Sequence, residues 1–417
     1  MFHQLFQRPH AVNRYLTSPL LEIRRRYLLH CAEQGAKHPT LRGIAIYQLI
    51  VIGYLHLKKE RIVTLQEIKT AANRWARHQT KQRHFKCIAS QLLSKNRFIR
   101  TATNWLRFSK HLKIPAAQPV APEVAAFTNY MRKERGLSEE TIRYRCQSIQ
   151  KFLNRIYDQG LSLAKITILE IDTILIQEFN QGKYSRSTIQ TFASTLRSFF
   201  RYAQYCGWCR PYIAEAIKTP RVYKHAALPS SPTWEEVKRL LKTTQSDHPT
   251  DIRDRAILLL LAVYGLRSGE VLRLQLEDFN WEQETFQITR SKGGQRQQFP
   301  LNRTIEQPLI RYLKDVRPHS SYREIFLTTR APIIPLSRGA LTQIVGRRWK
   351  ALNVSILHQG PHSLRHACAT RLINQGISLK VIADQLGHRN LETTRIYAKV
   401  DLSRLREVAN FNLGGLL

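Results

Sequence analysis

Apolar residues recur along most of the chain at the three- and four-residue spacing of one helix face, which predicts a mainly α-helical protein. The segment "SEETIRYRCQSIQKFLNRIYDQG" begins at the capping residue Ser138 and ends near Gly160. Its apolar side chains share one face: Ile142, Ile149, Phe152, Leu153 and Ile156. In "SRSTIQTFASTLRSFFRYAQYCG" a second stripe lies opposite three arginines: Ile189, Phe192, Leu196, Phe199 and Phe200 against Arg186, Arg197 and Arg201. Residues 119–216 should therefore form a helical unit with basic outer faces.

The first 110 residues show the same periodicity in four segments, residues 41–57, 65–78, 85–95 and 102–112. The run Ile44–Leu57 is too short for a membrane span and is interrupted by polar residues and glycine, so it predicts a buried helix. This region holds 21 Lys and Arg against 4 Asp and Glu. It is either a helical module that contacts DNA or a solvated basic surface without a target.

Two proline-rich stretches predict the domain boundaries. "KIPAAQPVAPE" lies around residues 113–122, and "KTPRVYKHAALPSSP" contains Pro220, Pro229 and Pro232. Together with the helical patterns, they predict three parts: residues 1–112, 119–216 and 228–417.

The third part carries the β signal of the chain. It opens with a capping box, Thr233 and Glu236 in "TWEEV", followed by the buried helix "IRDRAILLLLAVYG", which should end at Gly265. The runs "ETFQITR" and "RQQFPL" are joined by "SKGGQ", which predicts a β-hairpin, and helices follow to the end. In those helices we expect a core of Leu364, Ala367, Leu372, Ile373, Val381, Ile382 and Leu386. The predicted fold class is mainly α with a small antiparallel β-sheet.

Charge narrows the possible partners. Lys and Arg total 66 against 30 Asp and Glu, a net charge of +36, which favours a polyanionic partner and nucleic acid first. An anionic membrane surface is the competing partner, but neither a polybasic anchor nor a signal peptide is evident. Six cysteines do not suggest a disulfide scaffold, and Cys206 and Cys209 in "CGWC" lack the context of a redox or zinc motif. We expect a protein of the reducing cytoplasm without a membrane partner.

The stretch "PHSLRHACATRLINQGISLKVIADQLGHRNLETTRIY", residues 361–397, admits three kinds of chemistry. His362 and His366 have the spacing of two zinc ligands, but Ser363 occupies the glutamate position of the metalloprotease motif and no further ligands cluster nearby. "SLKVIADQLGH" has the spacing of a DNA-reading helix-turn-helix, which leaves His362 and Arg365 unexplained. We therefore expect no metal at these histidines, and His366 should be structural.

The third chemistry is phosphoryl transfer. Cleaving a DNA phosphodiester without a metal requires cations on the non-bridging oxygens, a proton for the leaving oxygen and a nucleophile. Arginine is the best clamp, because its planar fork holds two oxygens and keeps its charge. The candidates are Arg267 in "YGLRSGE", Lys292 on the predicted hairpin, His362 and Arg365 in "HSLR", His388 in "LGH", and Tyr397.

The order of these motifs resembles that of the tyrosine recombinase (phage integrase) family: "GLRSGE", a lysine hairpin, "HSLRH", "LGH" and a tyrosine nine residues later. The resemblance covers residues 233 to about 400, and residues 119–216 resemble the family's core-binding domain. It does not extend to residues 1–110. It implies a helical core-binding domain and a catalytic domain that form a C-shaped clamp on DNA, here with an extra helical N-terminal region.

The resemblance also implies a role for each residue. Tyr397 would be the nucleophile that forms a 3′-phosphotyrosyl bond, and Arg267 and Arg365 the phosphate clamp. Lys292 would be the general acid for the leaving oxygen, although Arg290 and Arg296 lie close on the same hairpin. His362 would handle protons, His388 would hydrogen-bond the phosphate, and Glu270 would support the structure. The implied enzyme is a tyrosine-type DNA strand transferase that uses no metal, ATP or other cofactor.

The implied partners are double-stranded DNA at a specific recombination site and three further copies of the chain, in a tetramer on DNA at the nucleoid. The extra N-terminal region favours integration or transposition of a mobile element. Leucines of the C-terminal tail would dock either on a neighbouring subunit or on their own domain: Leu413, Leu416 and Leu417. A non-catalytic basic DNA-binding or architectural protein remains the alternative, and a metal-dependent nuclease is a third.

Overall fold

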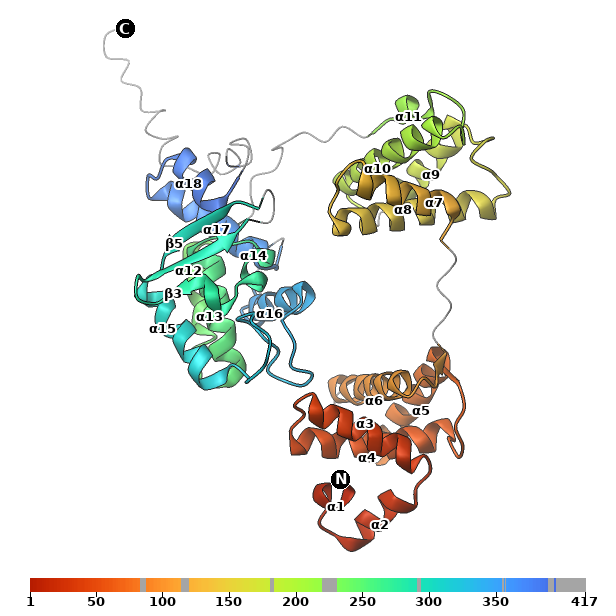
Figure 1. Ribbon diagram of the computed structural model, residues 1–417, viewed down its shortest axis with the longest axis vertical. Helices are drawn as coiled ribbons and strands as arrows, with labels where there is room; N and C mark the ends of the chain where they lie inside the picture. The colour runs from red at the N-terminus through yellow and green to blue at the C-terminus, as the bar shows by residue number, and fades with distance from the viewer. Residues whose placement is uncertain are drawn as a thin grey trace. The chain divides into compact units, whose positions relative to one another are not determined.

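The computed structural model describes residues 1–82, 88–113, 120–180, 184–219, 231–290, 294–354, 356, 358–388 and 394. Helices dominate these residues, and a small antiparallel sheet lies in the C-terminal part (Figure 1). The predicted fold class is therefore confirmed. The chain divides into two compact units, residues 115–226 and residues 1–114 with 227–417.

The N-terminal residues form six helices around cores that contain buried Val51, Phe98 and Trp105. A pair of two-residue strands, β1 (Val63–Thr64) and β2 (Leu112–Lys113), runs parallel. The helices are α1 (Phe2–Leu5), α2 (Pro9–Thr17), α3 (Leu21–Glu33), α4 (His38–Leu55), α5 (Leu65–Gln82) and α6 (Ile88–Phe108). Nowhere in the part of the chain that the structure describes is a helix both long and apolar enough to cross a membrane.

Helix α6 corrects one prediction. The sequence predicted separate helices over residues 85–95 and 102–112, but one helix runs from Ile88 to Phe108. The intervening "NRFIRT" contains neither glycine nor proline, so nothing in it breaks the backbone hydrogen bonds. Phe98 in this stretch is fully buried, so the helix continues across the polar residues on either side of it.

The unit 115–226 is helical, as predicted. The residues of both predicted apolar stripes are buried, except Phe192, which is partly buried. All of them except Ile189 belong to or pack against one core. Its helices are α7 (Pro122–Lys133), α8 (Glu139–Asp158), α9 (Ile168–Asn180), α10 (Arg186–Tyr205) and α11 (Ile213–Ala216).

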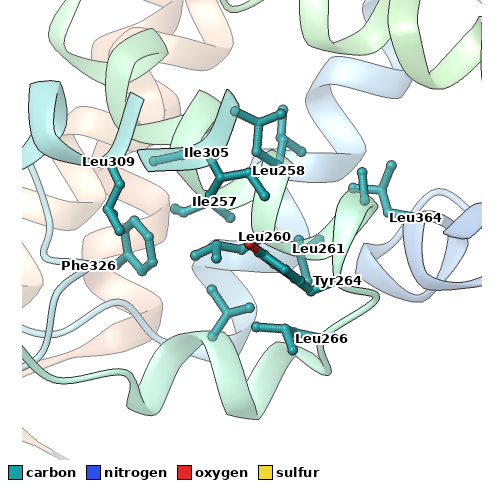
Figure 2. Packing of buried hydrophobic residues seen from close by; sticks show 14 of the residues in the cluster. Ile257, Leu258, Leu260, Leu261, Tyr264, Leu266, Ile305, Leu309, Phe326 and Leu364 are labelled. Atoms are coloured by element: carbon teal, nitrogen blue, oxygen red, sulfur yellow. The ribbon is translucent and has the colours of Figure 1, made fainter. Parts of the chain in front are cut away.

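The C-terminal part is built around α13 (Pro249–Val263), whose residues Ile257, Leu258, Leu260 and Leu261 are fully buried among neighbours from several helices (Figure 2). The predicted capping box at Thr233 and Glu236 begins α12. The other helices are α12 (Trp234–Lys242), α14 (Ser268–Arg273), η1 (Leu276–Asp278), α15 (Arg303–Arg311), η2 (Tyr312–Val316), α16 (Arg338–Ala351), α17 (Pro361–Asn374) and α18 (Leu379–Leu386).

The sheet has the order β3 (Phe279–Asn280), β4 (Thr285–Thr289), β5 (Arg296–Pro300), with antiparallel neighbours. Phe286 pairs with Phe299, and both are buried against the core. The predicted β4–β5 hairpin is confirmed, while its residues 291–293 lie outside the described residues. Strand β3 was not predicted, because two residues give no alternation to detect.

One predicted core residue is wrong. Val381 is 53% exposed, whereas Ile382 and Leu386, four residues apart, form the buried face of α18. Val381 lies in the first turn, beside this stripe. The other predicted core residues are buried or partly buried.

The two serines that begin α8 and α10 give a matched test of helix capping. Ser185 Oγ accepts the Thr188 N–H at 3.2 Å, whereas Ser138 Oγ contacts only Thr141 Oγ1. We expect Ser185→Ala to destabilise α10 by about 1 kcal/mol and Ser138→Ala to have a smaller effect on α8. Amide hydrogen exchange of the two helices measures both, and equal losses would contradict this assignment.

Candidate active site

Arg267 is held in place by the turn that ends α13. Gly265 has a φ of +62°, and a Cβ built there would lie 2.6 Å from Leu386 Cδ2, so this close approach requires glycine. Arg267 then begins α14, and its N–H and Nη1 donate to Glu270 at 2.8 and 3.0 Å. The predicted structural role of Glu270 is confirmed by these contacts.

Glu270 also forms an ion pair with a second arginine. Its other contact is Arg290, the residue after β4, whose Nη1 lies 3.2 Å from Glu270 Oε2, and both side chains are buried. Burial by itself would raise the pKa of Glu270, but the hydrogen bonds from Arg267 and the charge of Arg290 outweigh it and lower the pKa. One buried carboxylate therefore orients two guanidinium groups.

Helix α17 supplies His362 and Arg365. Pro361 occupies the first helical position, which suits its fixed φ, and His362 follows on an exposed part of the first turn. Arg365, one turn later, is buried and donates to Gly265 O at 2.6 Å and to Leu386 O at 2.7 Å. Arg365 thereby ties the end of α13 to the end of α18.

The C-terminal end of α18 completes the cluster. Gly387 adopts a φ of +64° as the C-cap, and its carbonyl accepts Arg267 Nη2 at 2.9 Å. His388 comes next, with Nδ1 2.8 Å from Thr394 Oγ1. The sequence boxes around Arg267, Arg365 and His388 thus meet at one helix end.

The histidines of this cluster resist protonation. Burial, followed by the positive charges of Arg365, Arg267 and Arg290, lowers the pKa of His388 to about 4. Partial removal from water and the charges of Arg365, Arg267 and others likewise lower the pKa of His362. Both rings are therefore neutral near pH 7, where each can donate one hydrogen bond and accept another.

Two predicted site residues, Lys292 and Tyr397, lie outside the described residues. The four others, Arg267, His362, Arg365 and His388, lie together. Arg290 is a further buried partner of this cluster that the sequence pattern did not indicate. The same holds for Gln297, which accepts a hydrogen bond from Arg290 Nε at 2.8 Å. Their only sequence signal is their place at the base of the hairpin.

The described residues contain no group of three or more His, Cys, Asp and Glu side chains that could hold a metal ion. The cluster is positively charged, because it contains three arginines, Arg267, Arg290 and Arg365, and one carboxylate, Glu270. Arg267 is a quarter exposed, and a guanidinium has five N–H donors, so the two bonds it makes leave donors for a further oxygen ligand. The arrangement suits a tetrahedral oxyanion such as phosphate.

The depressed histidine pKa values predict a loss of stability in acid. His366 on α17 also has a pKa lowered to about 4, mainly by burial. Since the unfolded chain binds a proton near pH 6.5 and the folded chain does not, the free energy of unfolding should fall as the pH drops from 6.5 to 4. We expect His366→Gln to remove on the order of 2 kcal/mol of this fall in denaturant titrations.

The control for that titration is His319→Gln, which removes an exposed histidine from the same part of the chain. An unchanged slope in His366→Gln would show that the His366 ring binds protons equally well in the folded and unfolded chains.

Two family models match the chain. Residues 233–404 match the phage integrase family, and residues 124–205 match the phage integrase N-terminal SAM-like domain. The Sinorhizobium fredii protein y4rA, an integrase/recombinase by name, is 34% identical over 292 residues, which are 70% of each chain. Tyrosine recombinase XerA of Pyrococcus horikoshii is 31% identical over 285 residues, 67% of this chain and 90% of that protein.

Solved structures with the same fold include two recombinases bound to DNA. The XerH site-specific recombinase on a palindromic difH substrate has a TM-score of 0.54 and 20% identity, over 85% of this chain and 98% of that one. A lambda integrase dimer on a COC′ core site has a TM-score of 0.53 and 22% identity, over 66% of this chain and 93% of that one. These two structures share the fold of this chain, and the family models and sequence matches show that the chain belongs to the phage integrase family, the tyrosine-type site-specific DNA recombinases.

Proposed function

We propose that this chain cleaves and rejoins double-stranded DNA at a specific recombination site through a 3′-phosphotyrosyl intermediate on Tyr397, without metal or ATP. The observation that carries the proposal is the convergence of Arg267, Arg365, His362 and His388 at the end of α18. These groups supply the positive charge and hydrogen bonds that a phosphodiester needs as it becomes pentacoordinate.

The two arginines act on the non-bridging oxygens. Their bonds to Gly387 and Leu386 carbonyls and to Glu270 fix the guanidinium planes before DNA arrives, so little reorganisation accompanies the reaction. His362 lies in the first turn of α17, where backbone N–H groups and the helix dipole also favour an anion.

Two proton transfers accompany cleavage of the strand. The Tyr397 oxygen attacks phosphorus, and its phenolic proton passes to His362, which is neutral because its pKa is lowered. The bond from phosphorus to the 5′ oxygen breaks, and that oxygen takes a proton from the Lys292 ammonium group. His388 donates a hydrogen bond to the phosphate. Attack by another 5′ hydroxyl reverses these transfers and rejoins the strand, because the phosphotyrosyl bond retains the energy of the original diester.

The first test is covalent capture on a nicked substrate. After cleavage, the short fragment that bears the new 5′ hydroxyl diffuses away, so the strand cannot be rejoined. We expect a protein–DNA adduct that resists denaturation and forms equally well in EDTA. Tyr397→Phe should abolish the adduct, since the phenol oxygen is the nucleophile, while binding the same DNA in gel-shift assays. An adduct with the Phe variant would place the nucleophile elsewhere.

Arg267→Ala should lower the single-turnover rate of adduct formation on the order of 100-fold or more, because it removes a preorganised donor to the charged transition state. Its affinity for DNA should change far less. A rate loss explained by weaker binding, which saturating protein would restore, would argue against a role for Arg267 in the transition state.

The unit 115–226 offers a surface for DNA. Between α8 and α10 lies a hollow of about 340 Å³ lined by Tyr130, serines and four arginines: Arg135, Arg145, Arg197 and Arg201. No acidic side chain lines it. Arg145 Nη1 lies 3.4 Å from Ser198 Oγ, so the two helices share one basic face. This face suits phosphates of the DNA backbone.

Salt dependence tests that surface. Arg145→Gln and Arg197→Gln should each lower the slope of log K against log salt by about 0.9, as one phosphate contact is lost. Lys151→Gln is the matched control, because this exposed residue on α8 is outside the hollow. Equal slope changes for all three variants would mean that total charge, and not this face, determines the contact.

We further propose that the chain forms a tetramer on DNA and that residues 1–112 are an accessory DNA-binding region. The reaction would integrate or transpose a mobile element at the nucleoid. The support for the accessory role is the charge of this region, 21 Lys and Arg against 4 Asp and Glu. Its described part also has a hollow of about 550 Å³ in which Tyr54 and Trp75 lie beside Arg14 and Arg74. Light scattering on the DNA complex tests the stoichiometry, and junction sequencing of the host DNA tests the mobile element.

A further inference from the structure

Arg290 is a buried arginine that none of the roles above uses. It follows β4, it is 5% exposed, and it stands two residues before Lys292 in the sequence. Its backbone N–H donates to Gln295 O at 2.8 Å, which closes the hairpin. The described residues that flank 291–293, where Lys292 stands in the sequence, are therefore joined by a backbone hydrogen bond.

The Arg290 side chain reaches three other elements. It donates to Glu270 on α14 at 3.2 Å, to Gln297 on β5 at 2.8 Å through Nε, and to the Gln385 carbonyl at the end of α18. Gln297 Nε2 in turn donates to the Asp384 carbonyl at 3.2 Å. The base of the hairpin is thus attached to the helix end that also binds Arg267 and Arg365.

Arg290 is packed closely between Gly387 and Phe299. A Cβ built on Gly387 would lie 2.6 Å from Arg290 Nε, and the guanidinium stacks over the Phe299 ring at 5.6 Å. Burial lowers the pKa of Arg290, while Glu270 opposes this effect. The charge is retained because it is paired and hydrogen-bonded, as buried charges require.

We infer that Arg290 is a positioning residue: it attaches the base of the β4–β5 hairpin to the helix end that binds the phosphate clamp, and through this attachment it sets the rate at which Lys292, two residues further along the chain, protonates the leaving group. The inference rests on the proposed function, in which Lys292 donates the proton. The chemistry predicts a specific defect. Without Arg290, Arg267 and Arg365 still bind the phosphate and Tyr397 still attacks it, but the general acid Lys292 is no longer well placed to protonate the 5′ oxygen.

The experiment compares two nicked substrates, one with the natural 5′ oxygen at the scissile phosphate and one with sulfur in its place. A thiolate is a much weaker base than an alkoxide, as pKa values of about 8.5 for a cysteine thiol and about 15.7 for water illustrate, so sulfur leaves without a proton. The full-length protein is used, and single-turnover adduct formation is measured at saturating protein.

We expect Arg290→Gln to lower the rate on the oxygen substrate on the order of 100-fold, the usual contribution of a general acid, and to cleave the sulfur substrate near the parent rate. Lys292→Ala should show the same selective pattern, whereas Arg267→Ala should lose rate on both substrates. The matched control is Arg296→Gln, which removes an exposed cation from the same hairpin and should keep the parent ratio of the two rates.

Thermal unfolding reports whether Arg290→Gln folds. If it does not, Gln297→Ala loosens the same attachment without leaving a buried charge unpaired, and a smaller loss confined to the oxygen substrate is expected. Equal losses on oxygen and sulfur, or no loss on oxygen, overturn the inference. Failure of the parent protein to form an adduct with either substrate would instead refute the proposed function.

Discussion

The site depends on the C-terminal end of α18, where four consecutive backbone carbonyls accept hydrogen bonds from four side chains. A helix necessarily leaves its last carbonyls without partners inside the helix, and they carry the negative end of its dipole. Here guanidinium and amide groups from distant parts of the chain occupy them: Gln297 binds Asp384, Arg290 binds Gln385, Arg365 binds Leu386 and Arg267 binds Gly387. An ordinary requirement of helix ends thereby becomes the means of assembling a cationic site.

This arrangement also explains how several arginines coexist at close range. Their mutual repulsion is opposed by the partial charges of the carbonyls and by one buried carboxylate, Glu270, whose pKa is held low by its contacts with Arg267 and Arg290. Burial, followed by the charges of Arg365, Arg267 and Arg290, lowers the pKa of His388 and keeps its ring neutral. Positive charge is therefore concentrated in groups that never lose it, and the histidines remain able to accept and donate protons.

Many of the helices and the β-hairpin could be predicted from local sequence. The stripes of α8 and α10, the capping box of α12 and the β4–β5 hairpin follow from periodicity and turn chemistry alone. The cluster members stood out because arginines, histidines and a tyrosine occur in one order, although the structure describes only four of the six. Val381 was misassigned because apolar character does not say which side of a helix a first-turn residue takes. The continuity of α6 was missed because the polar residues around Phe98 interrupt the apolar pattern, although neither glycine nor proline interrupts the helix there.

Arg290 shows the limit of such prediction most clearly. In the sequence it is one of several bases on a hairpin, and its partners are carbonyls and a carboxylate from other segments of the chain, which no local pattern reveals. Only the fold shows why the residue should be arginine. Its planar fork donates in several directions at once and joins α14, β5 and α18, whereas a lysine ammonium on a flexible stem would satisfy one neighbour and leave another buried group unpaired. The burial of a charge, costly by itself, becomes tolerable because each partner also needs a donor there. The constraint that assembles the site is therefore the shared need to satisfy polar groups at one buried helix end.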